Sequence, residues 1–164
     1  MTAAGVPWWH PANLIGSWFG TGYLPIASGT WGSLGALPFA WLIMDRFGPI
    51  GLAVAAAAAF LAGMWASAVI LQRSGRKDPS CIVIDEVAGQ WITLLPVLPL
   101  DPVLYAVGFV LFRIFDVLKP WPANWCDQQV PGALGVMLDD IVAGFYAAFG
   151  VHVIALANLQ FGFF

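Results

Sequence analysis

Residues 48–72 read GPIGLAVAAAAAFLAGMWASAVILQ, and none of these side chains carries a charge. An α-helix crosses the hydrocarbon core of a bilayer in about 20 residues, so this run is long enough for one crossing. Residues 141–164 form a second run without Asp, Glu, Lys or Arg. Over the whole chain 60% of residues are hydrophobic and 9% are charged, against roughly 25% charged in soluble domains. The composition therefore predicts an integral membrane protein.

Glycine and proline punctuate the chain around these two runs. Three shorter apolar stretches, at 30–44, 87–100 and 102–112, carry charges only at their edges. Together the apolar stretches predict five helical segments, at 31–46, 49–73, 81–99, 102–119 and 134–160.

The expected fold is all-α, a membrane bundle of about five to six helices that forms one domain over residues 1–164. Residues 1–30 would form an interfacial entrance that ends in a Gly-rich loop, and residues 31–160 would form the bundle. The segments at 81–99 and 102–119 are short for crossings. They could instead form one buried hairpin that dips into the membrane.

The basic residues predict the orientation of the bundle, because cytoplasmic loops near membrane spans are enriched in Lys and Arg. Arg73, Arg76 and Lys77 lie in one loop, which we expect on the cytoplasmic side. Alternate crossings then bring the starts of the first, third and fifth segments and the end of the fourth to the same side, with Asp101 opposite. The polar clusters should therefore share the cytoplasmic face.

Two pairs of adjacent acidic residues interrupt apolar sequence, at Asp85-Glu86 and at Asp139-Asp140. A charged residue at a span centre costs about 2.5–3.5 kcal/mol on insertion scales, so such residues are usually functional. The alternative is that acids in a first helical turn stabilise the helix dipole. Gly89 and Gly144 would let the two helices approach closely. Carboxylates brought together in this way predict an all-oxygen Mg²⁺ site.

Arg113, Asp116 and Lys119 follow at spacings of three, so a helix places them along one stripe. An intrahelical row of ion pairs is the simpler interpretation of such a stripe. Beside two acidic pairs, however, Arg113 and Lys119 are suited to binding phosphate oxygens. Asp116 would complete the metal ligands or orient Arg113.

The Gly-rich stretch 28–35 reads SGTWGSLG directly before an apolar helix. Backbone N–H groups and hydroxyls at a helix N-terminus attract anions, so we expect Thr30 and Ser33 to contact phosphate. A simple N-cap role for Ser33 is the alternative. Nucleic acid is not an expected partner, since the chain has only six Lys and Arg residues and a formal net charge of −3.

Four ordered motifs spanning about residues 20–150 carry a family resemblance. They are GYLP at 22–25 with 28–33, IVIDEVAG at 82–89, FRIFD at 112–116 with KPWP at 119–122, and GVMLDDIVAG at 135–144. The chain resembles the phosphatidylglycerophosphatase A family. It departs from that family's pattern at Ser28, where Pro is usual, and at Gln128, where a basic residue is common.

The resemblance implies a mostly helical, Mg²⁺-dependent enzyme of the bacterial inner membrane, multi-pass and with its site facing the cytoplasm. Its substrate would be the lipid phosphatidylglycerophosphate, hydrolysed to phosphatidylglycerol and inorganic phosphate. We expect Asp85, Glu86, Asp139 and Asp140 to be catalytic and, with Asp116, to hold the metal. Water would attack phosphorus in line with help from one carboxylate.

Two other functions compete with this interpretation. A CDP-alcohol phosphotransferase also uses acids and metal in a membrane, but the spaced Asp-Gly and Ala-Arg pattern of that family is missing. A small cation transporter or channel subunit could line an ion path with the acids. Such a path needs polar groups at several depths, whereas residues 48–72 have almost none.

Overall fold

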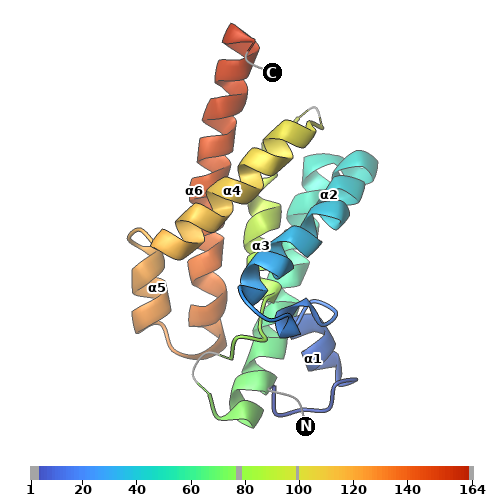
Figure 1. Ribbon diagram of the computed structural model, residues 1–164, viewed down its shortest axis with the longest axis vertical. Coiled ribbons are helices and arrows are strands. Elements are labelled where there is room, and N and C mark those ends of the chain that lie inside the picture. Colours follow the sequence, from blue (N-terminus) through green and yellow to red (C-terminus); the bar gives the residue numbers. More distant parts are fainter. Residues whose placement is uncertain (1–3, 77–78, 99, 163–164) are drawn as a thin grey trace.

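The computed structural model describes residues 4–76, 79–98 and 100–162, and helices account for all the regular structure in these ranges (Figure 1). The elements are α1 (Pro11–Gly16), a short 3-10 helix (Thr21–Tyr23), α2 (Ser28–Ser74), α3 (Ile84–Thr93), α4 (Pro102–Leu118), α5 (Ala123–Gln129) and α6 (Gly132–Phe161). The predicted all-α bundle is confirmed.

The long helix α2 reverses direction at Gly48, so it forms two arms, residues 28–47 and 49–74. Gly48 has φ 64° and ψ −167°, a conformation that only glycine adopts readily, and Pro49 follows it. Figure 1 shows the first arm rising in blue and the second descending in green. The break predicted between segments 31–46 and 49–73 is confirmed.

The short helix α3 lies at the centre of the bundle and packs mainly against α2 and α6. All its residues except Glu86 are buried. The sequence predicts a longer segment, 81–99, but the helix ends at Thr93 and turns follow it, with Pro96 among them; Pro99 lies outside the described residues. Ten residues rise only about 15 Å, half the thickness of a bilayer core.

Helices α3 and α6 touch at a pair of glycines. A Cβ atom at Gly89 would lie 2.5 Å from the Asp140 carbonyl oxygen, and one at Gly144 would lie 2.6 Å from the Gly89 carbonyl oxygen. No side chain fits between backbones this close. The predicted close approach at Gly89 and Gly144 is confirmed, and it brings the acidic residues of the two helices together.

The start of α2 differs from the prediction of a Gly-rich loop up to residue 30 and a helix from residue 31. The helix begins at Ser28, and Gly29 and Gly32 lie inside it. These residues have low helix propensity, but packing requires them. A Cβ at Gly29 would lie 1.8 Å from Glu86 Oε1, and one at Gly32 would lie 2.8 Å from Val83 Cβ. The glycines therefore serve close packing within a helix.

Two short helices, α1 and α5, fall where the sequence predicts only an entrance segment and a break. In α5 the buried residues are Ala123 and Cys126, one helical turn apart, and this helix packs on α6. That spacing is typical of an amphipathic helix. In α1 the start is capped by His10, whose Nδ1 accepts a hydrogen bond from the Ala12 N–H at 3.2 Å.

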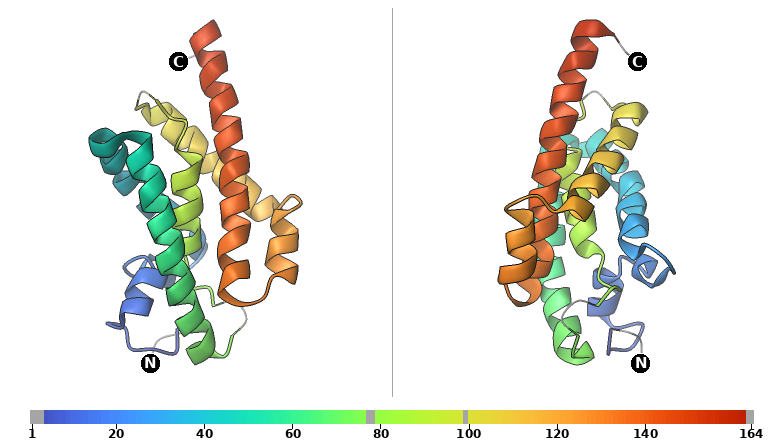
Figure 2. Two further views of the ribbon diagram at one scale, coloured as in Figure 1. Left: turned by 180° about the vertical axis from the view of Figure 1, so that it is seen from behind. Right: turned by 60° about the vertical axis from the view of Figure 1, so that its left-hand side comes forward.

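The polar helix ends lie at one end of the bundle, as predicted. Figure 2 shows α1, α5, the end of α2 and the start of α6 at the lower end, with the reversal of α2 and the end of α6 at the upper end. The basic loop with Arg73 and Arg76 also lies at the lower end; Lys77 lies outside the described residues. Asp101 caps α4 at the opposite end of that helix from Lys119.

Candidate active site

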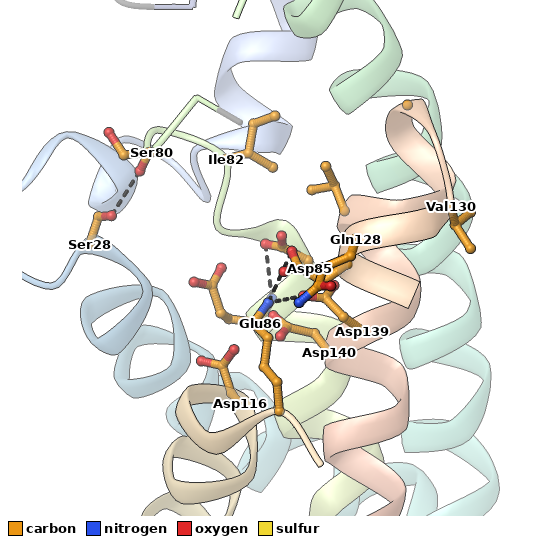
Figure 3. Close-up of a pocket in the computed structure, with 14 residues that line it drawn as sticks. Ser28, Ser80, Ile82, Asp85, Glu86, Asp116, Gln128, Val130, Asp139 and Asp140 are labelled. Carbon is orange, nitrogen blue, oxygen red and sulfur yellow. Dashed lines mark hydrogen bonds and ion pairs between the residues drawn. The ribbon is translucent and has the colours of Figure 1, made fainter. Parts of the chain in front are cut away.

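A polar cavity of about 510 Å³ opens toward the lower end of the bundle. Six carboxylates and one lysine line it: Asp85, Glu86, Asp116, Asp127, Asp139, Asp140 and Lys119. Figure 3 shows the side chains of Asp85, Glu86 and Asp116 reaching it from α3 and α4, with Asp139 and Asp140 reaching it from α6. Both predicted acidic pairs therefore line one cavity.

Three of these carboxylates form a tight cluster, which we call the acidic cluster: Asp85, Glu86 and Asp140. One oxygen from each lies within 4.8 Å of the other two. Asp85 and Glu86 occupy the first turn of α3, and Asp140 lies on α6 just before the glycine contact. The backbone N–H of Glu86 donates to Asp85 Oδ1 at 3.1 Å, which fixes the Asp85 side chain.

Burial makes this cluster costly without a cation. Asp85 is 9% exposed and Asp140 is 3% exposed, and Glu86 Oε2 is buried with no hydrogen-bond partner. Burial is the largest cause that raises the pKa of Asp85 and of Glu86, and the Asp85 charge raises that of Glu86 further. An all-oxygen donor set with an unpartnered carboxylate oxygen fits a hard divalent cation such as Mg²⁺.

Arg113 lies beside the acidic cluster, but it lines a separate apolar groove and not the cavity. Its Nη1 lies 2.7 Å from Asp116 Oδ2 and 3.9 Å from Glu86 Oε1, and it donates to Ser33 Oγ at 3.4 Å. The i,i+3 ion pair between Arg113 and Asp116 is the one that the predicted stripe implied. Ser33 in turn donates to the Gly29 carbonyl at 2.9 Å. Arg113 is thus held in place from three sides.

Lys119 leaves the predicted stripe, because it is the residue after α4 and adopts a left-handed conformation with φ 43°. Its ammonium pairs closely with Asp139 Oδ2 and lies 3.4 Å from Asp127 Oδ1. Burial alone would lower the pKa of Lys119, but the hydrogen bond and charge of Asp139 more than offset it, so that pKa is raised. The pair Asp139-Asp140 is therefore divided: Asp140 joins the acidic cluster and Asp139 pairs with Lys119.

The two predicted phosphate contacts at the start of α2 lie outside the cavity lining. Ser33 is buried inside the helix and Ala27 is the N-cap, so the alternative N-cap role of Ser33 is wrong. Thr30 lines the same apolar groove as Arg113. The residue of this stretch that lines the cavity is Ser28, which donates to the Ser80 carbonyl at 2.8 Å.

Sequence reasoning also missed part of the cavity wall on α5. Asp127 and Gln128 line the cavity, although they lie in a region predicted as a break between helices. The signal that would have revealed the helix is the spacing of Ala123 and Cys126, which lie three residues apart and are both buried. Asp127 follows them on the same helix.

The sequence matches known proteins over most of its length. Residues 14–155 match the model of the family described as Phosphatidylglycerophosphatase A. A protein of Escherichia coli with that name is 41% identical over 140 residues, which is 85% of this chain and 80% of the relative. The protein of the same name from Haemophilus influenzae is 32% identical over 145 residues, 88% of this chain and 89% of that one.

The name of a third relative refers to a different lipid headgroup. The Bacteroides thetaiotaomicron protein named "Putative phosphatidylinositol-3-phosphatase" is 39% identical over 141 residues, 82% of this chain and 87% of its own length. No solved structure matches the chain. The family match contains all four motifs, and the identity extends over most of both chains. The chain belongs to the phosphatidylglycerophosphatase A family.

Proposed function

We propose that this protein is a Mg²⁺-dependent phosphatase that hydrolyses phosphatidylglycerophosphate to phosphatidylglycerol and inorganic phosphate, in bacterial glycerophospholipid synthesis. The observation that carries the proposal is the acidic cluster, with carboxylate oxygens within 4.8 Å of one another in a cavity of an otherwise apolar bundle. Such a cluster is expected where a divalent cation is needed. The names of the Escherichia coli and Haemophilus influenzae relatives supply the lipid.

Asp85, Glu86 and Asp140 would hold the metal, with Asp116 close by on α4. A divalent cation in this position supplies Lewis acidity, which polarises phosphoryl oxygens and makes water more acidic. Asp116 pairs with Arg113, so its role toward the metal would be to orient that guanidinium.

Two basic residues outside the acidic cluster would bind the substrate's phosphates, and Asp139 would move the proton. Lys119 lines the cavity and would supply positive charge for the terminal phosphate, while Arg113, between the cavity and the neighbouring apolar groove, offers a fork of N–H donors. Asp139 has one oxygen paired with Lys119, while its Oδ1 is buried without a hydrogen-bond partner. We assign this free oxygen to accepting one proton of the water that attacks phosphorus in line; the P–O bond on the opposite side breaks, and the departing alkoxide takes its proton from solvent.

The same proposal places the protein in the bacterial inner membrane. Two helices, α2 and α6, are long and apolar enough to cross a bilayer, and only 33% and 28% of their most apolar windows are buried. A core helix of a soluble protein would be mostly buried. Large apolar side chains such as Ile50, Phe149 and Leu159 are instead 70–80% exposed, which suits lipid contact. Arg73 and Arg76 lie at the same end as the cavity, so this end would face the cytoplasm.

Phosphate release from phosphatidylglycerophosphate by the detergent-solubilised protein tests the proposal. We expect release that chelation of divalent ions stops and added Mg²⁺ restores. Asp140→Asn should abolish it, whereas Asp45→Asn, which changes an acid with a side chain 55% exposed and far from the cavity, should leave it unchanged. Absence of Mg²⁺-dependent release, with cation flux in protein-containing vesicles instead, would favour the transporter alternative and overturn the proposal.

A further inference from the structure

An apolar groove of about 490 Å³ runs along α4 beside the start of α2. Its lining side chains are apolar except for Thr30 and Arg113; the main apolar ones are Phe109, Val110, Ile114 and Val117. In Figure 1, α4 and the first arm of α2 lie on the same side of the bundle, facing the viewer. Val110 is 53% exposed and Val117 is 71% exposed, so the protein itself leaves this apolar surface uncovered.

The groove and the acidic cavity meet at Arg113. This residue lines the groove, while its guanidinium pairs with Asp116 and approaches Glu86, both of which line the cavity. The partition is thin at this point, because Gly29 next to it has no side chain. A Cβ at Gly29 would lie 3.2 Å from Arg113 Nη1 and 1.8 Å from Glu86 Oε1. A molecule in the groove would therefore lie one side chain away from the acidic cluster.

We propose that this groove binds the diacylglycerol end of the lipid substrate, with one acyl chain against Val110, Ile114 and Val117 and the phosphodiester at Arg113. This assignment rests on the proposed function, because it places the terminal phosphate of the substrate in the cavity. The substrate carries two phosphates separated by one glycerol unit, so a cation between groove and cavity matches the inner phosphate. Apolar walls on one side of this cation and carboxylates on the other match the two ends of such a lipid.

A second apolar groove lacks the charged residue that distinguishes the first. It measures about 440 Å³ and lies between α2, α3 and α6, with Ala57, Phe60 and Phe145 among its lining residues. All the described side chains that line it are apolar, and none of them lines the cavity. An acyl chain bound there would have no charged group beside it to orient the headgroup. This groove therefore provides the control for the first.

The test fills each groove with a tryptophan and compares two substrates. Val110→Trp occupies the proposed groove, and Ala57→Trp occupies the control groove at a residue that is also exposed. For each variant and the parent, kcat/KM is measured for long-chain phosphatidylglycerophosphate and for its deacylated, water-soluble counterpart. The readout is the ratio of the two values, which cancels general damage to the active site.

We expect Val110→Trp to lower this ratio about tenfold, because the indole fills the groove and an acyl chain can no longer pack there while the phosphodiester lies at Arg113. Ala57→Trp should leave the ratio at the parent value, and Ile114→Trp should repeat the effect of Val110→Trp. Equal ratios for Val110→Trp and Ala57→Trp would overturn the groove assignment while the parent still hydrolyses the lipid. A change of oligomeric state in light scattering with an unchanged ratio would also overturn it and would indicate a second copy of the chain in the groove. A parent without activity on the lipid would refute the proposed function instead.

Discussion

Replacing Gly144 by alanine would place a methyl group against the backbone of α3, beside the acidic cluster. Its Cβ would lie 2.6 Å from the Gly89 carbonyl oxygen and 3.1 Å from the Gly89 Cα. Ordinary contacts at Cβ begin at 3.4 Å, so the distance must increase by about 0.8 Å. Both partners are helix backbone, which cannot rotate away, so α6 must shift relative to α3.

This shift would separate Asp140 from Asp85 and Glu86, since the glycine contact lies one turn from all three. Displacement by about 1 Å at a reacting centre can lower a rate by roughly a hundredfold. Overpacking of this kind costs about 1–3 kcal/mol of stability. We therefore expect Gly144→Ala to fold, to melt at a lower temperature, and to lose most of its Mg²⁺ affinity and its turnover.

Three measurements follow this variant: thermal unfolding in detergent, Mg²⁺ binding by calorimetry, and phosphate release from phosphatidylglycerophosphate. Gly150→Ala is the matched control, with the same substitution on the same helix. A Cβ there would lie 3.0 Å from Leu111 Cδ1, the end of a side chain that can move. If Gly144→Ala kept the Mg²⁺ affinity and turnover of Gly150→Ala, the contact between α3 and α6 would not set the geometry of the site.

Two further substitutions probe the site from other directions. Gly29→Ala puts a methyl group 1.8 Å from Glu86 Oε1, so Glu86 must swing away and Mg²⁺ affinity should fall; Gly35→Ala on the same helix meets only ordinary contacts and should bind Mg²⁺ normally. Lys119→Met leaves Asp139 buried without its cation and should lower the free energy of unfolding by roughly 2–3 kcal/mol. Breaking a fully buried pair costs about 3–5 kcal/mol, and the loss is smaller here because the Lys119 side chain is 30% exposed. Adding Asp139→Leu should recover part of that loss in a double-mutant cycle, and an additive loss would mean that the two residues do not interact.

The arrangement of helices was largely predictable because it follows from hydropathy and from the positions of Gly and Pro. The uncharged run 48–72 and the Gly48-Pro49 break lead directly to the two arms of α2. The length of α3 was overestimated because the residues after Thr93 are as apolar as those within the helix, so the hydropathy pattern continues past its end.

The acidic residues were predictable because carboxylates in apolar sequence are costly, but their division was not. Spacing cannot show that Lys119 turns out of the helix at φ 43° and reaches Asp139. Nor can it show that Gly29 lies inside a helix, because its role is to leave room for Glu86, a residue distant in the sequence. Contacts of this kind depend on the packing of three helices.

The position of the bound cation decides whether the acidic cluster is the metal site. Crystals of the full chain grown with Mn²⁺ in place of Mg²⁺ would give an anomalous signal that marks the ion. We predict a peak enclosed by the carboxylates of Asp85, Glu86 and Asp140, and its disappearance in Asp140→Asn. A peak that lies only beside Asp127, or no peak within the cavity at saturating Mn²⁺, would show that the acidic cluster is not the metal site.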